Sequence, residues 1–181
     1  MKFGLIGRNG SGKSLVGEWF ASLGFHVTSL SDEIRQEAER QHKPLDRDTL
    51  TEISNQLKAA EGMGVLAQRA IQSTQGYDRV VFDSIRHPDE VRILKANGVV
   101  FMGIDAAMKI RYQRISNRKR DTDFVDFETF KQQDDAEFFG DRPAQNIQAC
   151  WAHCDVIVDN NQEDKNVLWA AVEQVVGAWI D

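Results

Sequence analysis

Short apolar runs alternate with longer amphipathic segments along the chain. Five of these runs have the length and composition of buried strands, namely residues 2–6, 25–30, 79–83, 99–104 and 155–159. Between them, apolar residues recur every three or four positions, which is typical of helices. Strands that alternate with helices favour a parallel sheet with right-handed crossovers. The pattern therefore predicts an α/β fold of three layers, with helices on both faces of a five-stranded parallel sheet.

Pro, Gly and capping residues mark the ends of the predicted helices. We expect helices that begin near Lys13, Ser31–Asp32, Asp48, Pro88, Ala106, Phe127 and Pro143, and a last helix that buries Leu168, Val172, Val175 and Trp179. The helix after Asp48 reaches about Ser73, but Gly62 and Gly64 interrupt it. The two glycines form either a hinge or a break between two helices.

The length, charge and composition of the chain limit the number of domains and the kinds of partner that we expect. With 181 residues and no internal repeat or linker-like stretch, the chain is expected to form a single domain, residues 1–181. A formal net charge of −6 disfavours nucleic acid as the main partner, because a phosphate backbone requires a basic surface. The longest apolar run, Val99–Ile104, is too short to cross a bilayer, so no membrane partner is expected. Two cysteines and the absence of a leader indicate a cytoplasmic protein.

Residues 7–14 carry the strongest chemical signal. They read Gly-Arg-Asn-Gly-Ser-Gly-Lys-Ser and fit the phosphate-binding pattern G-x-x-x-x-G-K-[ST], the P-loop. Its glycines let backbone N–H groups turn toward phosphate oxygens, and the following helix adds its positive end. Lys13 would bridge the β- and γ-phosphates, and the Ser14 hydroxyl would bind Mg²⁺. The alternative is a glycine-rich turn with a chance lysine, which the strand before it and the helix after it disfavour.

The P-loop predicts ATP and Mg²⁺ as cofactors. The residues expected to bind the nucleotide are Gly7, Arg8, Asn9, Gly10, Ser11, Gly12, Lys13, Ser14 and Leu15. A second metal-binding candidate is Asp83, which ends the apolar run Val80–Phe82. A carboxylate in this position orients Mg²⁺ or its water in P-loop enzymes, whereas a helix cap or an ion pair is the alternative role.

Three arginines share one face of the helix predicted over about 106–119. Arg111, Arg114 and Arg118 stand at i, i+3 and i+7, beside an apolar stripe that can pack on the sheet. Arginines on a lid stabilise the charge that spreads over a phosphoryl group during transfer. The pattern predicts a lid that turns three guanidinium groups toward the cleft. A solvated basic face, balanced by acids such as Asp134 and Asp135, is the alternative.

Two further arginines follow the ends of predicted strands. Arg35 lies one turn into the helix after Ser31–Asp32, and Arg86 lies three residues after Asp83. Arginines that converge from two strands suit a second phosphate, one that the P-loop does not hold. Ion pairs on the surface are the alternative reading.

The order of these segments resembles nucleoside-monophosphate-kinase-like proteins. The segments are the P-loop, Ser31–Arg35, Asp83–Arg86 and the arginine-rich lid. Residues 28–70 and 79–95 are most similar to the deoxynucleoside monophosphate kinase and deoxycytidylate-deaminase-associated kinase group. The lid and residues 152–160 also resemble dephospho-CoA kinases and their uncharacterised archaeal relatives. The resemblance covers nearly the whole chain, but only the P-loop is specific by itself.

The resemblance implies both an architecture and residue roles. It implies a P-loop NTPase fold with strand order 2-3-1-4-5, an acceptor-binding helical segment over about 31–75 and a helical lid over about 111–142. By position, Arg35 and Arg86 would hold the phosphate of the acceptor, and Asp32 would contact its sugar or base. Asp83 would contact either the acceptor or Mg²⁺.

The lid and the end of the fifth strand supply the remaining implied residues. Arg114 and Arg118 would act in catalysis from the lid, together with Lys13, and Asn160 would lie near the donor base. The chain lacks the base-reading patterns of adenylate, guanylate and thymidylate kinases, so the resemblance leaves the acceptor open.

We therefore expect an ATP-dependent phosphotransferase whose acceptor is a small phosphorylated metabolite, with a (deoxy)nucleoside monophosphate as the favoured one. A dephospho-CoA-type kinase is the alternative within this class, and a regulatory ATPase that binds a macromolecule is the alternative from another class. A GTPase is disfavoured because no Asn-Lys-x-Asp segment occurs. Cys150 and Cys154 lack the spacing of a zinc site and are expected to be buried thiols. The oligomeric state, monomer or homodimer, stays open.

Overall fold

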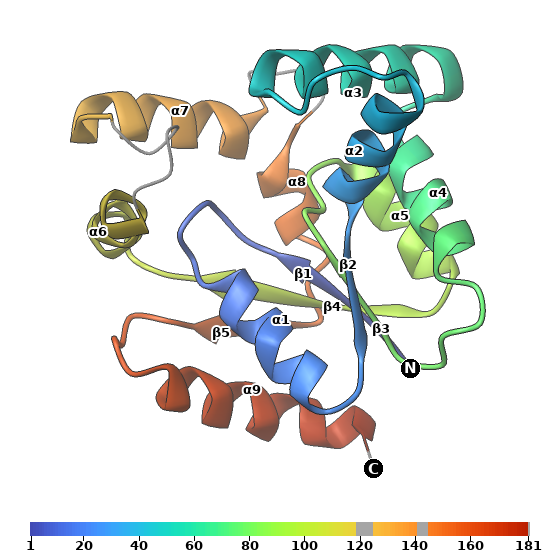
Figure 1. Cartoon of the computed structure of the whole chain (residues 1–181). Coiled ribbons are helices and arrows are strands. Elements are labelled where there is room, and N and C mark those ends of the chain that lie inside the picture. The colour runs from blue at the N-terminus through green and yellow to red at the C-terminus, as the bar shows by residue number, and fades with distance from the viewer. Residues whose placement is uncertain (119–124, 141–144, 181) are drawn as a thin grey trace.

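A five-stranded parallel sheet forms the centre of the molecule (Figure 1). The computed structural model describes residues 1–118, 125–140 and 145–180, with the side chains of residues 178 and 180 excepted. The strands are β1 (Lys2–Ile6), β2 (His26–Ser29), β3 (Val80–Asp83), β4 (Val99–Asp105) and β5 (Val156–Asp159). Their order is β2-β3-β1-β4-β5, and every neighbouring pair is parallel. The predicted fold class and strand order are confirmed.

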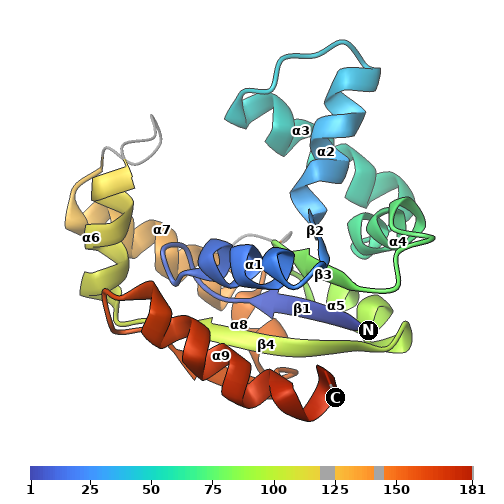
Figure 2. The ribbon, with the colours of Figure 1, turned by 60° about the horizontal axis from the view of Figure 1, so that its bottom comes forward.

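Helices cover both faces of the sheet. Their bounds are α1 (Lys13–Ser22), α2 (Leu30–Arg40), α3 (Arg47–Glu61), α4 (Val65–Ser73), α5 (Pro88–Ala96), α6 (Met108–Arg118), α7 (Phe127–Phe139), α8 (Ile147–Trp151) and α9 (Lys165–Ile180). The α2–α3 pair and the α6–α7 pair project from the body of the molecule on its two sides (Figures 1 and 2). Within the described residues, no helix combines the length and apolar character that crossing a membrane requires.

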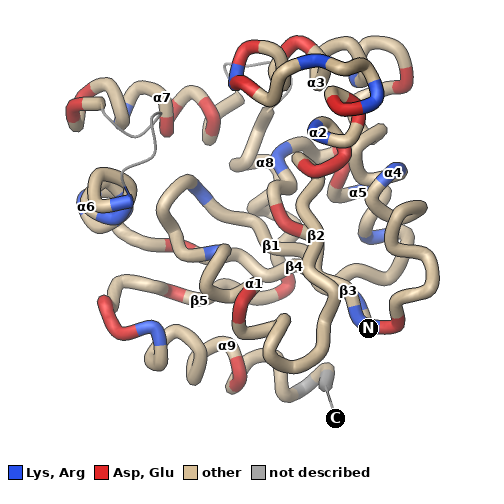
Figure 3. Tube along the Cα trace, viewed as in Figure 1, with Lys and Arg blue, Asp and Glu red and all other residues tan. Residues whose placement is uncertain are grey.

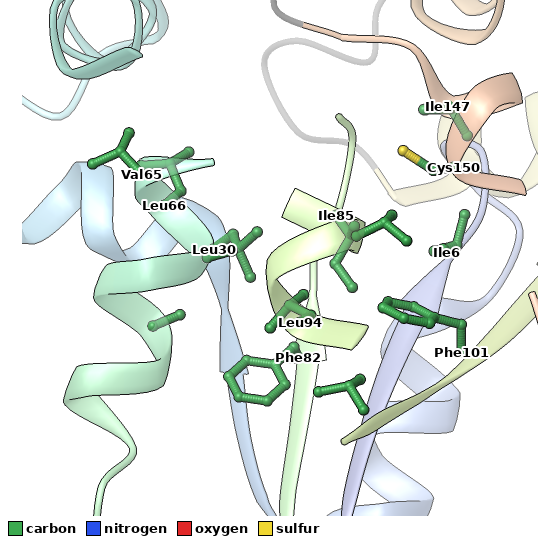
Figure 4. Close-up of a cluster of buried hydrophobic side chains, with 14 of the residues drawn as sticks. Ile6, Leu30, Val65, Leu66, Phe82, Ile85, Leu94, Phe101, Ile147 and Cys150 are labelled. Carbon is green, nitrogen blue, oxygen red and sulfur yellow. The ribbon is translucent and has the colours of Figure 1, made fainter. Parts of the chain in front are cut away.

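Alternate residues of the strands enter two separate hydrophobic cores, because side chains of a strand point in turn to opposite faces. In β1, Phe3 and Leu5 join α1 and α9, whereas Ile6 joins the core under α2, α4, α5 and α8. Figure 4 shows part of the second core, where Ile6, Phe82 and Phe101 lie among side chains from these helices. Because helices cover both faces of the sheet, side chains on both sides of the inner strands are buried, and these strands are continuous runs of apolar residues.

Local hydrogen bonds refine the predicted helix boundaries. The N-cap of α2 is Ser29 and not Ser31 or Asp32, so the helix begins earlier than expected. The Asp32 side chain accepts a bond from the Ser29 N–H, which completes a capping box. Gly62 ends α3 with φ +94°, a conformation that favours glycine, and α4 begins at Val65. The two glycines therefore form a break between two helices.

The last two helices differ in detail from the prediction. Asn146 caps α8, which begins at Ile147, and Pro143 lies outside the described residues. In α9 the fully buried positions are Leu168, Val172 and Val176, the last of which the sequence did not single out. Val175 and Trp179 are partly buried and pack against the same core.

Candidate functional site

The P-loop joins the end of β1 to the start of α1 and packs tightly on its surroundings. Gly10 and Gly12 have φ values of +77° and +105°, which side chains rarely allow. A Cβ atom at Gly10 would lie 2.7 Å from the carbonyl oxygen of Arg111, and one at Gly12 would lie 2.2 Å from Nδ2 of Asn160. Glycine is therefore required at both positions by backbone conformation and by space.

The Lys13 side chain folds back over the P-loop. Its Nζ donates hydrogen bonds to the carbonyl oxygens of Gly7 at 2.8 Å and Arg8 at 3.2 Å. Burial lowers the pKa of Lys13, and the carboxylate of Asp83 partly opposes this effect. A nearby anion stabilises the charged form of a buried ammonium group, because the attraction offsets the loss of hydration.

One cavity brings together the three predicted residues of the donor and metal site. It has a volume of about 360 Å³ and is lined by Lys13, Ser14 and Asp83 together with Leu5, Gly17, Glu18, Ala21 and Val27. Ser14 is exposed and Asp83 is partly buried. A hydroxyl and a carboxylate beside a phosphate site fit Mg²⁺, which usually takes few protein ligands and completes its shell with phosphate oxygens and water. The described residues contain no cluster of three or more metal-ligating side chains.

Asn160, directly after β5, holds the P-loop through a side-chain hydrogen bond. Its side chain is buried, and Nδ2 donates to the carbonyl oxygen of Ser11 at 2.8 Å. Its own N–H donates to the carbonyl oxygen of Asp105 at 2.7 Å, at the end of β4. In addition, the Trp169 indole of α9 donates to the carbonyl oxygen of Leu15, at the start of α1, at 2.9 Å. The bracing role of Asn160 was missed in the sequence, and the expected contact with the donor base stays a prediction.

The end of β3 lies beside the end of β2 and carries a strained residue. Ser84 has φ +62°, which is uncommon for a residue other than glycine. Its N–H donates to Oδ1 of Asp83 at 2.6 Å, and its hydroxyl accepts from Ser29 at 2.8 Å. In the register of the sheet, Ser29 pairs with Asp83. Strained backbone conformations are common at functional sites. Here the conformation of Ser84 directs the chain from Asp83 toward Arg86.

The two arginines expected to bind a second phosphate lie at the same edge of the sheet. Arg35, in α2, donates from Nη1 to Oγ of Ser31 at 2.9 Å and to Oδ1 of Asp32 at 2.8 Å. Arg86 lies in the turn between β3 and α5, and its Nη1 is 3.8 Å from Oε2 of Glu137. Both side chains are partly exposed, so their guanidinium groups are accessible to an anion.

Arg111 differs from the prediction that three guanidinium groups of α6 face the cleft. Its side chain is buried, and both terminal nitrogens donate to the carboxylate of Asp134 in α7, at 2.6 and 2.8 Å. It also donates from Nη1 to the carbonyl oxygen of Asn9 at 3.2 Å. Arg111 is therefore a structural link between α6, α7 and the P-loop. Its partner is distant in the sequence, so the helical spacing could not reveal it.

The other two lid arginines lie on the accessible part of α6. Arg114 donates from Nη2 to the carbonyl oxygen of Gln162 at 2.7 Å, and burial lowers its pKa. Arg118 ends the helix and also has an interaction partner. Figure 3 shows basic residues on α6 beside the acidic residues of α7. Residues 119–124 and 141–142 of the predicted lid lie outside the described part of the chain.

Arg8 joins α7 to the P-loop, a contact that the sequence pattern did not predict. Its Nη2 is 2.7 Å from Oδ2 of Asp134 and 3.0 Å from Oδ1 of Asp135. The guanidinium carbon lies 4.2 Å from the centre of the Phe138 ring, a cation–π contact. The adjacent acids Asp134 and Asp135 in the predicted helix were the available signal, but they were interpreted only as charge balance.

The prediction of buried thiols is confirmed for Cys150 and only in part for Cys154. Cys150 is buried in α8, and Cys154 is half-buried just beyond it. Burial raises the pKa of both thiols to about 12, so neither is a thiolate near neutral pH.

The fold and the site together define a protein of the P-loop kinase fold. Among solved structures, a shikimate kinase from Bacteroides thetaiotaomicron matches with a TM-score of 0.65 and 14% identity, covering 98% of this chain and 97% of that one. The Thermus thermophilus protein TT1252 matches with a TM-score of 0.67 and 18% identity, covering 100% and 98%. These likenesses show the fold and leave the substrate undefined.

The chain belongs to the UPF0200 family. A UPF0200 protein of Methanosarcina barkeri is 31% identical over 138 residues, which cover 73% of this chain and 74% of that protein. One of Pyrococcus horikoshii is 28% identical over 97% of both chains. A UPF0200/UPF0201 protein of Archaeoglobus fulgidus is 34% identical over 70% of this chain, which spans only 42% of that longer relative. No family model matches the chain.

Proposed function

We propose that this protein is an ATP- and Mg²⁺-dependent phosphotransferase that moves the γ-phosphoryl group to a small phosphorylated acceptor, with a (deoxy)nucleoside monophosphate as the favoured class. The observation that carries the proposal is the arrangement at the carboxyl edge of three adjacent strands. Lys13 follows β1, Asp83 ends β3 and Arg86 follows it, and Arg35 follows β2. In open α/β sheets, ligands bind at this edge.

The P-loop would hold the donor. Its N–H groups and the start of α1 bind the β- and γ-phosphates, and Lys13 leaves the carbonyl oxygens of Gly7 and Arg8 to contact them. Ser14 and Asp83 would hold Mg²⁺, which neutralises charge on the phosphates. In this arrangement the protein's own task is to position the groups and to stabilise charge.

The acceptor would bind across the cavity from the P-loop. Arg35 and Arg86 would pair with its phosphate, since guanidinium groups bind phosphate with two parallel hydrogen bonds. Asp32, which accepts from Arg35 at 2.8 Å, would orient that arginine and contact the sugar. Arg114 and Arg118 would approach the transferred group from α6, and closure over the site would exclude water.

A direct assay tests the proposal. Purified protein is mixed with ATP, Mg²⁺ and one acceptor at a time, from a panel of AMP, GMP, CMP, UMP, their deoxy forms, dTMP, dephospho-CoA and shikimate. We expect transfer to at least one nucleoside monophosphate, detected as the phosphorylated product. Steady ATP hydrolysis without any phosphorylated acceptor would contradict the proposal. Product from dephospho-CoA alone would select that acceptor class.

The variant Arg35→Ala/Arg86→Ala separates a kinase from a regulatory ATPase. In a kinase, this variant loses transfer and keeps ATP binding, because the two arginines serve only the acceptor. A regulatory ATPase would keep its hydrolysis rate in the same variant and would lose a macromolecular partner instead.

A further inference from the structure

A buried ion pair lies directly behind the turn that carries Arg86. Nζ of Lys58 in α3 is 3.5 Å from Oε1 of Glu90 in α5, and the two side chains are only 6% and 1% exposed. Burying two charges costs free energy that their attraction does not always return. Replacing such a pair with neutral side chains is often neutral for stability. A gain in stability therefore does not explain the pair well.

The second oxygen of Glu90 holds the main chain of the turn. Oε2 accepts hydrogen bonds from the N–H of Arg86 at 2.8 Å and from the N–H of His87 at 3.0 Å. The same carboxylate thus contacts Lys58 with one oxygen and the backbone at Arg86 with the other. A rigid bridge runs from α3 through Glu90 to the residue proposed to bind the acceptor's phosphate.

A comparison of the capping boxes of α2 and α5 shows how the contact between Lys58 and Glu90 differs from an ordinary helix cap. In α2 the capping acid is Asp32, and its cation is Arg35 of the same helix, on the surface. In α5 the capping acid is Glu90, and its cation comes from another helix and is buried. A capping box needs no cation to end a helix. The link between α3 and α5 is thus an addition to the cap.

A second contact joins α5 to the start of α4, the helix that follows α3. A Cβ atom at Gly64, where α4 begins, would lie 2.2 Å from Cδ1 of Ile93 in α5. The start of α4 therefore touches α5 directly, while Lys58 reaches α5 from the last turn of α3. The α3–α4 segment is therefore held to α5 by apolar packing of α4 and by the charged contact of Lys58.

We propose that Lys58 and Glu90 are positioning residues for Arg86, and that their pair fixes the β3–α5 turn relative to α3 so that the guanidinium group meets the acceptor's phosphate. The inference rests on the proposed function, because it requires Arg86 to bind that phosphate. Misplacement of a binding group by about 1 Å can cost a hundredfold in rate. Loss of the pair should therefore affect acceptor use and leave the P-loop intact.

Steady-state kinetics test the proposal with Lys58→Met, Glu90→Gln and the double variant. The assay uses ATP with AMP, dCMP, dTMP and dephospho-CoA as acceptors. We expect the KM of the acceptor to rise about tenfold or more, while the KM of ATP changes less than twofold. The double variant should keep its thermal midpoint, because both buried charges are gone. Lys58→Arg should restore most of the lost acceptor affinity.

A matched control removes an exposed pair from the same helix. Asp89→Asn/Arg92→Met changes two partners that lie 3.5 Å apart on the surface of α5. Its KM values for ATP and for the acceptor should both stay near those of the wild type. Equal changes in both KM values for the Lys58 and Glu90 variants, or no change in either, would overturn the proposal.

Amide hydrogen exchange provides a readout that needs no acceptor. In Lys58→Met, the amides of residues 84–87 should exchange at least about tenfold faster, because Glu90 loses its buried cation and holds the turn less firmly. Unchanged exchange in this segment would show that the pair does not hold the turn. If the wild type phosphorylates no acceptor, the proposed function fails, and the exchange rates still decide whether the pair holds the turn.

Discussion

The charge of Lys13 carries a free-energy cost in the folded chain, because the side chain is buried. Burial lowers the pKa of this lysine, so the folded state holds its proton less firmly than the unfolded chain does. Stability therefore rises as the pH increases through the folded pKa toward the unfolded value of about 10.4. Below the folded pKa the lysine is charged, and the fold bears the full cost of burying it.

We predict that Lys13→Met removes ATP binding without lowering the thermal midpoint of the protein alone. Affinity for ATP should fall about a hundredfold or more, because the main cation of the donor site is lost. Differential scanning fluorimetry and isothermal titration calorimetry measure the two effects. Lys95→Met, at an exposed position, is the matched control and should bind ATP normally. A lower midpoint for Lys13→Met alone would show that the lysine stabilises the fold.

The thiols allow a second prediction for single residues. Because the pKa of Cys150 and of Cys154 is about 12, almost no thiolate is present at pH 8. We expect a thiol reagent such as DTNB to react with the folded chain at least about a hundredfold more slowly than with the chain in guanidinium chloride. Rapid labelling of the folded protein would show that the helix α8 region opens readily.

Single residues also show what the sequence could reveal. The P-loop, Asp83, Arg35 and Arg86 could be located in the sequence because each ends or follows a strand, and parallel strands end at one edge. The partner of Arg111 and the partner of Glu90 could not be located. Each lies in a different helix, and a contact between helices depends on packing that local periodicity does not encode.

At the scale of elements, one buried carboxylate of α7 contacts both Arg8 of the P-loop and Arg111 of α6. Asp134 accepts from Arg111 at 2.6 and 2.8 Å and lies 2.7 Å from Nη2 of Arg8. The helical periodicity correctly predicted both α6 and α7. It did not predict that their charged faces would meet each other, because the same residues suit a solvated surface.

We predict that Asp134→Asn lowers the free energy of unfolding by about 3 kcal/mol, because it removes the carboxylate of the buried Arg111 and one of the two carboxylates of Arg8. Asp135→Asn is the matched control. Asp135 is 36% exposed at its side chain and contacts only Arg8 among the described residues, so its loss should cost less than about 1 kcal/mol. Urea denaturation followed by circular dichroism measures both values. Equal effects would show that the buried position of Asp134 is unimportant.

At the scale of the whole molecule, one sheet joins two hydrophobic cores. Phe20 lies in the core under α1 and α9, and Phe82 lies in the core under α2, α4 and α5. Because every inner strand contributes to both cores, neither core can form without the sheet. The expectation of a single domain follows from this arrangement.

We predict that Phe20→Ala and Phe82→Ala each lower the free energy of unfolding by about 3–5 kcal/mol, since both side chains are fully buried. Each variant should still unfold in one transition. Tryptophan fluorescence and far-ultraviolet circular dichroism should give the same midpoint. Separate midpoints for the two probes would show that the two cores unfold independently and would contradict a single domain.

Because β1 lies between β3 and β4 in the sheet, it cannot form its strand pairs until those later strands have been translated. Translation makes β1 and the P-loop well before β3 and β4, the strands with which β1 pairs. The P-loop also needs Arg111 beside it and Asn160 below it. A nascent chain that ends before Asn160 therefore contains the complete phosphate-binding motif without the brace that shapes it. The segment most easily recognised in the sequence is among the last to acquire its structure during synthesis.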